Sequence, residues 1–309
     1  MSLWAPLAAL GASGCAATAS ALQHRTAVAV RAAEGTNSAT EPTTMTSARA
    51  TVTHPMWLLA VGLQGCGFLL HAAALAIGQL IVVQPLLVCV VLVALPLNHA
   101  LGREPITRRE LGWAALLVAA LAGFLVTAST SIGIGPETAD AGPAVVAAVA
   151  GALAVAGCLL IAWRQRSRRG LVAGVLGAGA GILFAGQAAL LKSSVGLLSG
   201  GVLALLGNWQ PYLLIVVGLC GILCCQLAFR AGPLSASLPL VNTVNPLLGV
   251  VIGVLVYDEQ LRHSAPALAA ELLCLAALTL ATVMLTRLEH APPGGVAAGP
   301  ATRRCRTGG

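Results

Sequence analysis

The stretch that decides the fold is residues 56–101, MWLLAVGLQGCGFLLHAAALAIGQLIVVQPLLVCVVLVALPLNHAL. It is almost wholly apolar, yet it is about twice as long as the roughly 20 helical residues that one crossing of a bilayer needs. We therefore expect it to cross a membrane twice, turning back at Gly78-Gln79, where a glycine and a polar amide interrupt the apolar run. This stretch predicts a polytopic helical membrane protein.

The composition of the whole chain agrees with a lipid environment. Of 309 residues, 58% are hydrophobic and 9% are charged, and the mean hydropathy is +0.90. A soluble domain of this size could not keep so much apolar surface away from water. The net charge is +7, but the basic residues form short clusters between apolar runs without interleaved aromatics, so we expect no nucleic-acid partner.

Nine spans are predicted from apolar windows of about 20 residues bounded by charged or turn-forming residues. The fold class we expect is therefore all-α integral membrane. Between the first two spans, the Thr-, Ala- and Ser-rich residues 23–55 are expected to form a flexible loop. The predicted spans are residues 3–22, 56–77, 79–101, 110–129, 143–163, 170–191, 212–229, 234–257 and 265–286.

The basic residues predict the orientation of these spans. With the loop 23–55 in the cytoplasm, fifteen of the seventeen Lys and Arg residues lie on that side, and only Lys192 and Arg262 lie outside. Under the positive-inside rule, nine spans then place the N-terminus outside and the C-terminus in the cytoplasm. Because the Ala-, Arg- and Gly-rich composition is typical of a GC-rich bacterial genome, we expect a multi-pass protein of the plasma (inner) membrane. We expect the tail, 287–309, to be disordered and cytoplasmic.

A shift of 154 residues aligns two parts of the chain in the pattern A-x3-G-x-L-x4-P-L. An acidic turn follows each copy, at Glu104 and at Asp258-Glu259. The matched residues are Ala74, Gly78, Leu80, Pro85 and Leu86 in the first copy and Ala228, Gly232, Leu234, Pro239 and Leu240 in the second.

The repeat predicts an inverted arrangement. Spans two to four correspond to spans seven to nine, a displacement of five crossings, so the two copies have opposite orientations in the membrane. The predicted halves are residues 1–129 and 143–286, joined by an external linker at 130–142. Inverted repeats are a device of secondary transporters, whereas duplication in a structural membrane protein is the alternative.

Two segments carry a resemblance to a known family. They are AIGQLIVVQPLLVCVVLVALPLNHALGREPITRRELGWAALLVAALAGFLV, at 76–126, and AFRAGPLSASLPLVNTVNPLLGVVIGVLVYDEQL, at 228–261. They resemble the paired EamA-like modules of the drug/metabolite transporter superfamily, over most of residues 1–286. With nine helices and a first helix ending in QHR, the chain is similar to the NIPA-like branch. The resemblance implies solute transport and, for that branch, magnesium, although a fold alone supplies no ligand.

Six polar side chains within the spans are candidate substrate-binding residues. Glu271 is the one carboxylate well inside a predicted span, where an ionised group is costly. It could bind a cation, exchange a proton, or simply pack as a protonated group. The amides could bind a solute or another helix, and His71 could bind substrate or meet interfacial water. The six are Glu271, Asn245, Asn242, Gln84, Gln187 and His71, and no metal-ligand set is predicted.

Proline and glycine positions predict hinges. Three prolines lack an N–H and release the carbonyls four residues earlier, which could line a solute path or only kink the helices. Lys192, by contrast, is expected to snorkel to the outer headgroups and to have no further role. The hinge residues we assign are Pro85, Pro239, Pro246, Gly78 and Gly232.

The function that the sequence predicts is a secondary transporter that moves a small polar solute by alternating access. A magnesium or other divalent-cation transporter, and a non-transporting scaffold or partner subunit that uses the arginines of 164–169, stay open as alternatives. Since no GxxxxGK[ST] or HExxH motif occurs, we expect no enzyme activity and no cofactor. The expected partners are a small-molecule or ion substrate and the lipid bilayer, and a homodimer is left open.

Overall fold

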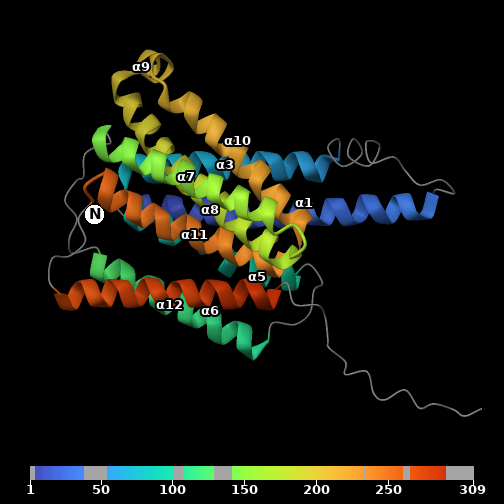
Figure 1. The fold of residues 1–309 in the computed structure, drawn as a ribbon. Coiled ribbons are helices and arrows are strands. Elements are labelled where there is room, and N and C mark those ends of the chain that lie inside the picture. Colours follow the sequence, from blue (N-terminus) through green and yellow to red (C-terminus); the bar gives the residue numbers. More distant parts are fainter. Residues whose placement is uncertain are drawn as a thin grey trace, which may run out of the picture.

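The computed structural model describes residues 4–37, 54–100, 107–128, 141–232, 234–259 and 265–289, and these form helices and turns without any strand. Nine helical segments of this part of the chain are long and apolar enough to cross a membrane, and one of them, Leu80–Leu97, consists of two shorter helices. They lie side by side with broadly aligned axes (Figure 1). The prediction of an all-α, multi-pass membrane protein is therefore confirmed.

The helices have the following bounds. The long ones are α1 (Trp4–Asn37), α3 (Pro55–Ile77), α6 (Arg108–Ala128), α7 (Ala141–Arg164), α8 (Arg169–Gly196), α10 (Gln210–Ala231), α11 (Leu234–Val256) and α12 (Ala265–Glu289). The shorter ones are α4 (Leu80–Leu87), α5 (Val90–Ala100), the 3-10 helix η2 (Leu197–Gly200) and α9 (Val202–Gly207).

α8 lies at the centre of the packing. It contacts α10, α11, α7 and α3, and half of its membrane-spanning window is buried. α7 packs on α8 from outside, with none of its own window buried. α6 and α12 pack against each other along one side of the bundle (Figure 1).

α1 differs from the sequence expectation because it continues to Asn37, whereas a loop was expected from residue 23. The added segment is rich in alanine, which favours helix. The polar residues of this segment end the stretch that is apolar enough to lie in a membrane, but they do not end the helix. The rest of that loop, 38–53, lies outside the described residues, as do 130–140 of the predicted linker. α12 continues to Glu289, so the predicted tail is helical at its start.

The expected turn at Gly78-Gln79 is confirmed between α3 and α4. A Cβ at Gly78 would lie 2.7 Å from the Ala74 carbonyl oxygen and 2.8 Å from Ala5 Cβ, at the start of α1. Only glycine allows this approach. At Gly232, which follows α10, a Cβ would lie 2.5 Å from the Arg169 carbonyl oxygen, at the start of α8.

The third predicted span is interrupted, because a turn at Val88-Cys89 separates α4 from α5. In this turn the Cys89 N–H donates to the Leu86 carbonyl over 3.0 Å. The Ser13 hydroxyl of α1 lies 3.0 Å from the Ala9 carbonyl oxygen of its own helix and 3.3 Å from the Leu86 oxygen, so these two carbonyls share its one proton. α11, in contrast, continues through both Pro239 and Pro246, so the aligned Pro85 and Pro239 lie in helices with different local structure.

Contacts between helix ends distinguish the two ends of the bundle. At one, which we call the Lys192 end, the start of α1, the end of α3 and the start of α4 meet the ends of α8 and α11. At the other, the Arg169 end, the start of α8 meets the end of α10. The two ends therefore differ in which helices begin and finish there.

Candidate functional site

A buried carboxylate joins three helices at the Lys192 end. Glu259, three residues after α11, is 1% exposed. Its Oε1 accepts the backbone N–H of Leu80 and its Oε2 that of Ile81, each over 2.8 Å. These N–H groups begin α4 and have no acceptor within the helix. Because the N-terminus of a helix carries a partial positive charge, a carboxylate is well placed there.

Lys192 of α8 completes the cluster. Its Nζ forms an ion pair with Glu259 Oε1 and lies 4.6 Å from the centroid of the Tyr257 ring. The Tyr257 hydroxyl donates to the Ala189 carbonyl over 2.6 Å, so Ser193, whose Oγ is also 2.6 Å away, donates to Tyr257. Burial raises the pKa of Tyr257 to about 12, which keeps its hydroxyl protonated.

The backbone around Glu259 is shaped to bring its side chain inward. Asp258 has a positive φ of 48°, a conformation that Asp tolerates better than most residues. The Glu259 N–H donates to the Gly253 carbonyl over 3.0 Å. A Cβ at Gly253 would lie 2.6 Å from Glu259 Oε2, so this glycine leaves room for the carboxylate.

Gln84 lies one turn deeper along α4. It is 1% exposed, and both amide atoms, Oε1 and Nε2, lack a hydrogen-bond partner. A Cβ at Gly249 of α11 would lie 2.5 Å from its Cγ, so Gln84 packs directly on that helix. An unsatisfied buried amide costs about 1–3 kcal/mol. Such a group needs an explanation other than packing.

Other buried polar atoms of the same helices are also unsatisfied. Buried atoms without a hydrogen-bond partner include His71 Nε2 of α3 and two on α11, Asn245 Oδ1 and Thr243 Oγ1. His71 precedes the end of α3 by six residues and Gln84 follows the start of α4 by four. At 1.5 Å per residue, both lie roughly 6–9 Å inside the Lys192 end.

The remaining candidates have other surroundings. Gln187 of α8 packs against α10, where a Cβ at Gly218 would lie 2.9 Å from its Nε2. Asn242 is half-buried on α11. Glu271 is 1% exposed on α12, the helix that pairs with α6. The structure thus brings Gln84 to the charged cluster, whereas Glu271 belongs to a different helix pair.

The prediction for Lys192 was wrong: its side chain is 8% exposed and paired, so it does not reach the headgroups. Sequence reasoning also missed the roles of Glu259, Tyr257 and Ser193. A signal was present, because Lys192 is the one lysine of the chain and both it and the acidic turn close spans that run to the outer side. The missing step was to pair the two charges.

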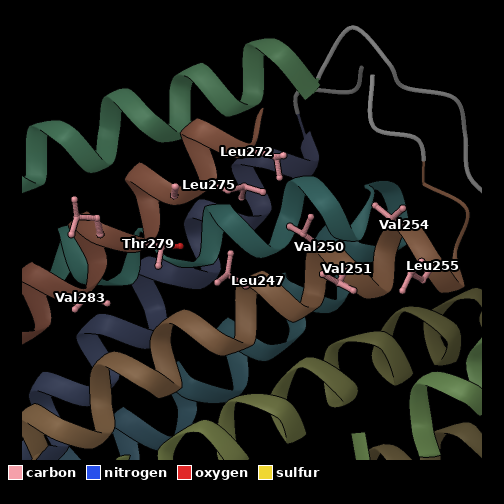
Figure 2. A pocket seen from close by; sticks show the side chains of 11 residues that line it. Leu247, Val250, Val251, Val254, Leu255, Leu272, Leu275, Thr279 and Val283 are labelled. Atoms are coloured by element: carbon pink, nitrogen blue, oxygen red, sulfur yellow. The ribbon is translucent and has the colours of Figure 1, made fainter. Parts of the chain in front are cut away.

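Metal ligands do not gather in the described residues, where no three His, Cys, Asp or Glu side chains are close enough to share an ion. A pocket of about 820 Å³ opens between α11 and α12 (Figure 2). Thr279 supplies the one polar side chain among its lining residues, and Leu255 and Leu272 on its rim are exposed. Such a lining suits the hydrocarbon chains of lipid rather than a polar solute.

Comparisons with known proteins find a relative that is similar in sequence over most of the chain. The chain is 28% identical over 241 residues to an uncharacterized protein of Corynebacterium glutamicum, covering 78% of this chain and 82% of that protein. No family model matches the sequence, and no solved structure matches the fold. The likeness therefore identifies no activity, and the geometry of the site is what bears on function.

Proposed function

We propose that the protein is a secondary transporter that moves a small polar solute across the plasma (inner) membrane by alternating access. The observation that carries this proposal is the charged cluster of Lys192 and Glu259 above the buried, unsatisfied Gln84. Polar groups inside an apolar bundle are expensive and are found mostly where a solute or ion passes. The cluster closes one end, and Gln84 offers hydrogen bonds directly below it.

The order of the helices supports two halves of opposite orientation. α1 begins, α3 ends and α4 begins at the Lys192 end, whereas α8 begins, α10 ends and α11 begins at the Arg169 end. α1 packs on α3 as α8 packs on α10. These reversed trios follow the alignment of residues 74–86 with 228–240. Halves of this kind can exchange roles and open a central site to each side in turn.

The interruption of α4 and α5 supplies a place where the bundle can bend. A break at Val88-Cys89 lets α4 move with Glu259 and Lys192 while α5 stays with α1. Pro85 precedes the break, and Pro239 and Pro246 lie in the facing helix, α11. In this proposal these prolines, with Gly78 and Gly232, act as the hinges.

The charge of the cluster favours a polar solute over Mg²⁺. Magnesium in proteins is usually held by one or two carboxylates and several waters. Here Lys192 neutralises the charge of Glu259, so the pair offers a divalent cation little attraction. Magnesium transport therefore remains the second candidate only through the family resemblance.

The experiment that tests transport need not assume a solute. Proteoliposomes holding the purified protein are incubated with a ¹³C-labelled extract of bacterial metabolites, washed, and analysed by mass spectrometry for trapped solutes. A Mg²⁺ indicator enclosed in parallel vesicles tests the ion. We expect at least one labelled solute to enter faster than into empty vesicles, and the entry to fall in Gln84→Leu.

Leu160→Ala is the matched control, because Leu160 is an exposed residue near the end of α7, which leads to the Arg169 end and not to the cluster. It should leave uptake unchanged. If folded wild-type protein admits no labelled solute and no Mg²⁺, the transport proposal is wrong. The scaffold alternative, in which the arginines of 164–169 dock anionic lipid or a protein, would then be preferred.

A further inference from the structure

The groups around the Glu259 carboxylate form a receptor for an anion, and they come from other helices. The Leu80 and Ile81 N–H groups belong to α4, and the Lys192 ammonium belongs to α8. Without a carboxylate between them, these groups would leave a buried positive charge next to the positive end of a helix. A buried charge without a partner is strongly unfavourable. These groups therefore need a carboxylate between them, but a carboxylate from another molecule satisfies them as well as that of Glu259.

We propose that Glu259 is a tethered occupant of a carboxylate-binding site, and that a free carboxylate from a solute takes its place. This inference rests on the proposed function in one respect, since it makes the transported solute a small molecule that carries a carboxylate. The binding site itself does not depend on transport.

The exchange is balanced in charge and hydrogen bonds. When a solute carboxylate enters, Lys192 keeps an anionic partner and the two N–H groups of α4 keep an acceptor. Glu259 moves to the aqueous side of the Lys192 end, where water solvates its charge. The site therefore passes from one paired state to another without a stage at which a buried charge stays alone, a condition that a simple opening of the ion pair does not meet.

Gln84 is the second observation that points to a ligand. Gln84 is buried, and both polar atoms of its amide lack a hydrogen-bond partner. It follows Leu80 by four residues, so the two side chains lie on the same face of α4. One helical turn is about 5.4 Å, so a solute held by its carboxylate at Leu80 and Ile81 would place its next few atoms beside Gln84. The amide can both donate and accept, which suits a hydroxyl or an ammonium group.

The chemical class that follows is a small hydroxy- or amino-carboxylate. The glycines of α11 let that helix pack directly on the site, because a Cβ at Gly249 or Gly253 would lie within 2.6 Å of Gln84 Cγ or Glu259 Oε2. A solute carboxylate therefore takes the volume that the Glu259 side chain vacates. A dicarboxylate fits less well, since the cluster holds one Lys and one pair of helix N–H groups for a single carboxylate.

The test is chemical rescue of Glu259→Ala by acetate, which matches the methylene and carboxylate that the substitution removes. The thermal unfolding midpoint of the purified protein is followed with increasing sodium acetate, and in parallel with acetamide plus sodium chloride at the same ionic strength. We expect a saturating rise with acetate, as for a ligand that binds the folded state, that exceeds the rise in wild type, where Glu259 competes. Acetamide should have no such effect.

Lys192→Met in the Glu259→Ala background removes the receptor's charge, and it should abolish the rescue. If Glu259→Ala does not fold, Glu259→Gln, which preserves the volume, replaces it in the same series. The proposal is overturned if acetate and acetamide act alike, or if the rescue survives Lys192→Met. Rescue in protein that admits no solute into vesicles would support the binding site and reject transport, so the two proposals fail separately.

Discussion

The Lys192–Glu259 pair is a single interaction on which several helices depend. Both side chains are buried, and the carboxylate also serves the first two N–H groups of α4. Removing one partner of a buried pair typically costs about 3–5 kcal/mol, because the other charge is left without compensation. Removing both charges together costs less, because no buried charge remains.

This non-additivity gives the first prediction. Lys192→Met and Glu259→Gln should each lower the free energy of unfolding by about 3–5 kcal/mol, while the double variant should be less damaged than the sum of the two. SDS-induced unfolding in mixed micelles measures all four proteins of the cycle. Additive losses would mean that the two side chains do not form a pair in the folded protein.

Gly253 gives the second prediction. A Cβ there would lie 2.6 Å from Glu259 Oε2 and 3.0 Å from Ile81 Cγ1, so Gly253→Ala has to push the carboxylate away from α4. Overpacking of this kind costs about 1–3 kcal/mol. Gly157→Ala on α7 is the matched control, since a Cβ at Gly157 meets nothing within 4 Å. Equal unfolding curves for the two variants would contradict the close packing at Gly253.

At this scale the sequence identified some residues and missed others for physical reasons. Gln84 was a candidate because an amide in an apolar span is conspicuous in one dimension. Lys192 and Glu259 were missed because each stands at the end of a span, where a charge normally meets water or headgroups. Their burial depends on how the ends of three helices meet in space, and no local sequence pattern predicts that.

At the scale of the helices, the break between α4 and α5 leaves backbone carbonyls that a side chain of another helix approaches. The turn at Val88-Cys89 leaves carbonyls near the end of α4, and Ser13 Oγ lies 3.3 Å from the Leu86 oxygen and 3.4 Å from the Leu87 oxygen. Ser13 itself is 1% exposed. Its proton is shared with the Ala9 carbonyl of α1 itself, 3.0 Å away, so the hydroxyl links α1 to the break through a weak, shared hydrogen bond.

The third prediction follows from that hydrogen bond. Ser13→Ala should destabilise the protein by about 0.6 kcal/mol, and by no more than about 1.7 kcal/mol, the range measured for hydrogen bonds between membrane helices. Ser20→Ala, an exposed position of the same helix, serves as the control in the same SDS titration. A loss at Ser20 as large as at Ser13 would show that the effect is one of helix propensity and not of this contact.

Most elements were predictable because apolar length is a strong signal in one dimension. The turn at Gly78-Gln79 and the nine spans needed only the thickness of the bilayer. The continuation of α1 to Asn37 was not predictable from hydropathy, because a helix can leave the membrane without ending. The break at Val88-Cys89 was hidden inside an unbroken apolar run.

At the scale of the whole molecule, the reversed order of the two helix trios and the distribution of arginines together predict how the protein is oriented in the membrane. The Arg169 end should face the cytoplasm and the Lys192 end the outside. A fluorescent protein fused after residue 289 should fluoresce and alkaline phosphatase fused there should be inactive, whereas fusions in the η2–α9 segment, at Gly200, should behave in the opposite way. The reverse pattern at both sites would place the Lys192 end in the cytoplasm and would contradict the predicted orientation.

The halves themselves could be proposed from the alignment of residues 74–86 with 228–240 because glycine and proline are less frequent coincidences than leucine and alanine. The solute could not be proposed in the same way. Its class depends on which polar groups the packing leaves unsatisfied, and these, such as Gln84, are defined by neighbours in α11 and not by adjacent sequence.

The most direct test of alternating access is to measure whether water reaches Gln84 from the two sides of the membrane. Gln84→Cys is placed in a variant whose native cysteines are replaced, and a membrane-impermeant maleimide is applied to right-side-out and inside-out vesicles, with Phe124→Cys, fully buried in α6, as control. Alternating access predicts that the thiol of Gln84→Cys reacts, and that adding Lys192→Met with Glu259→Gln speeds its reaction from the Lys192 end. Labelling of Gln84→Cys as slow as that of Phe124→Cys from both sides, in both backgrounds, would contradict a transport path through this bundle.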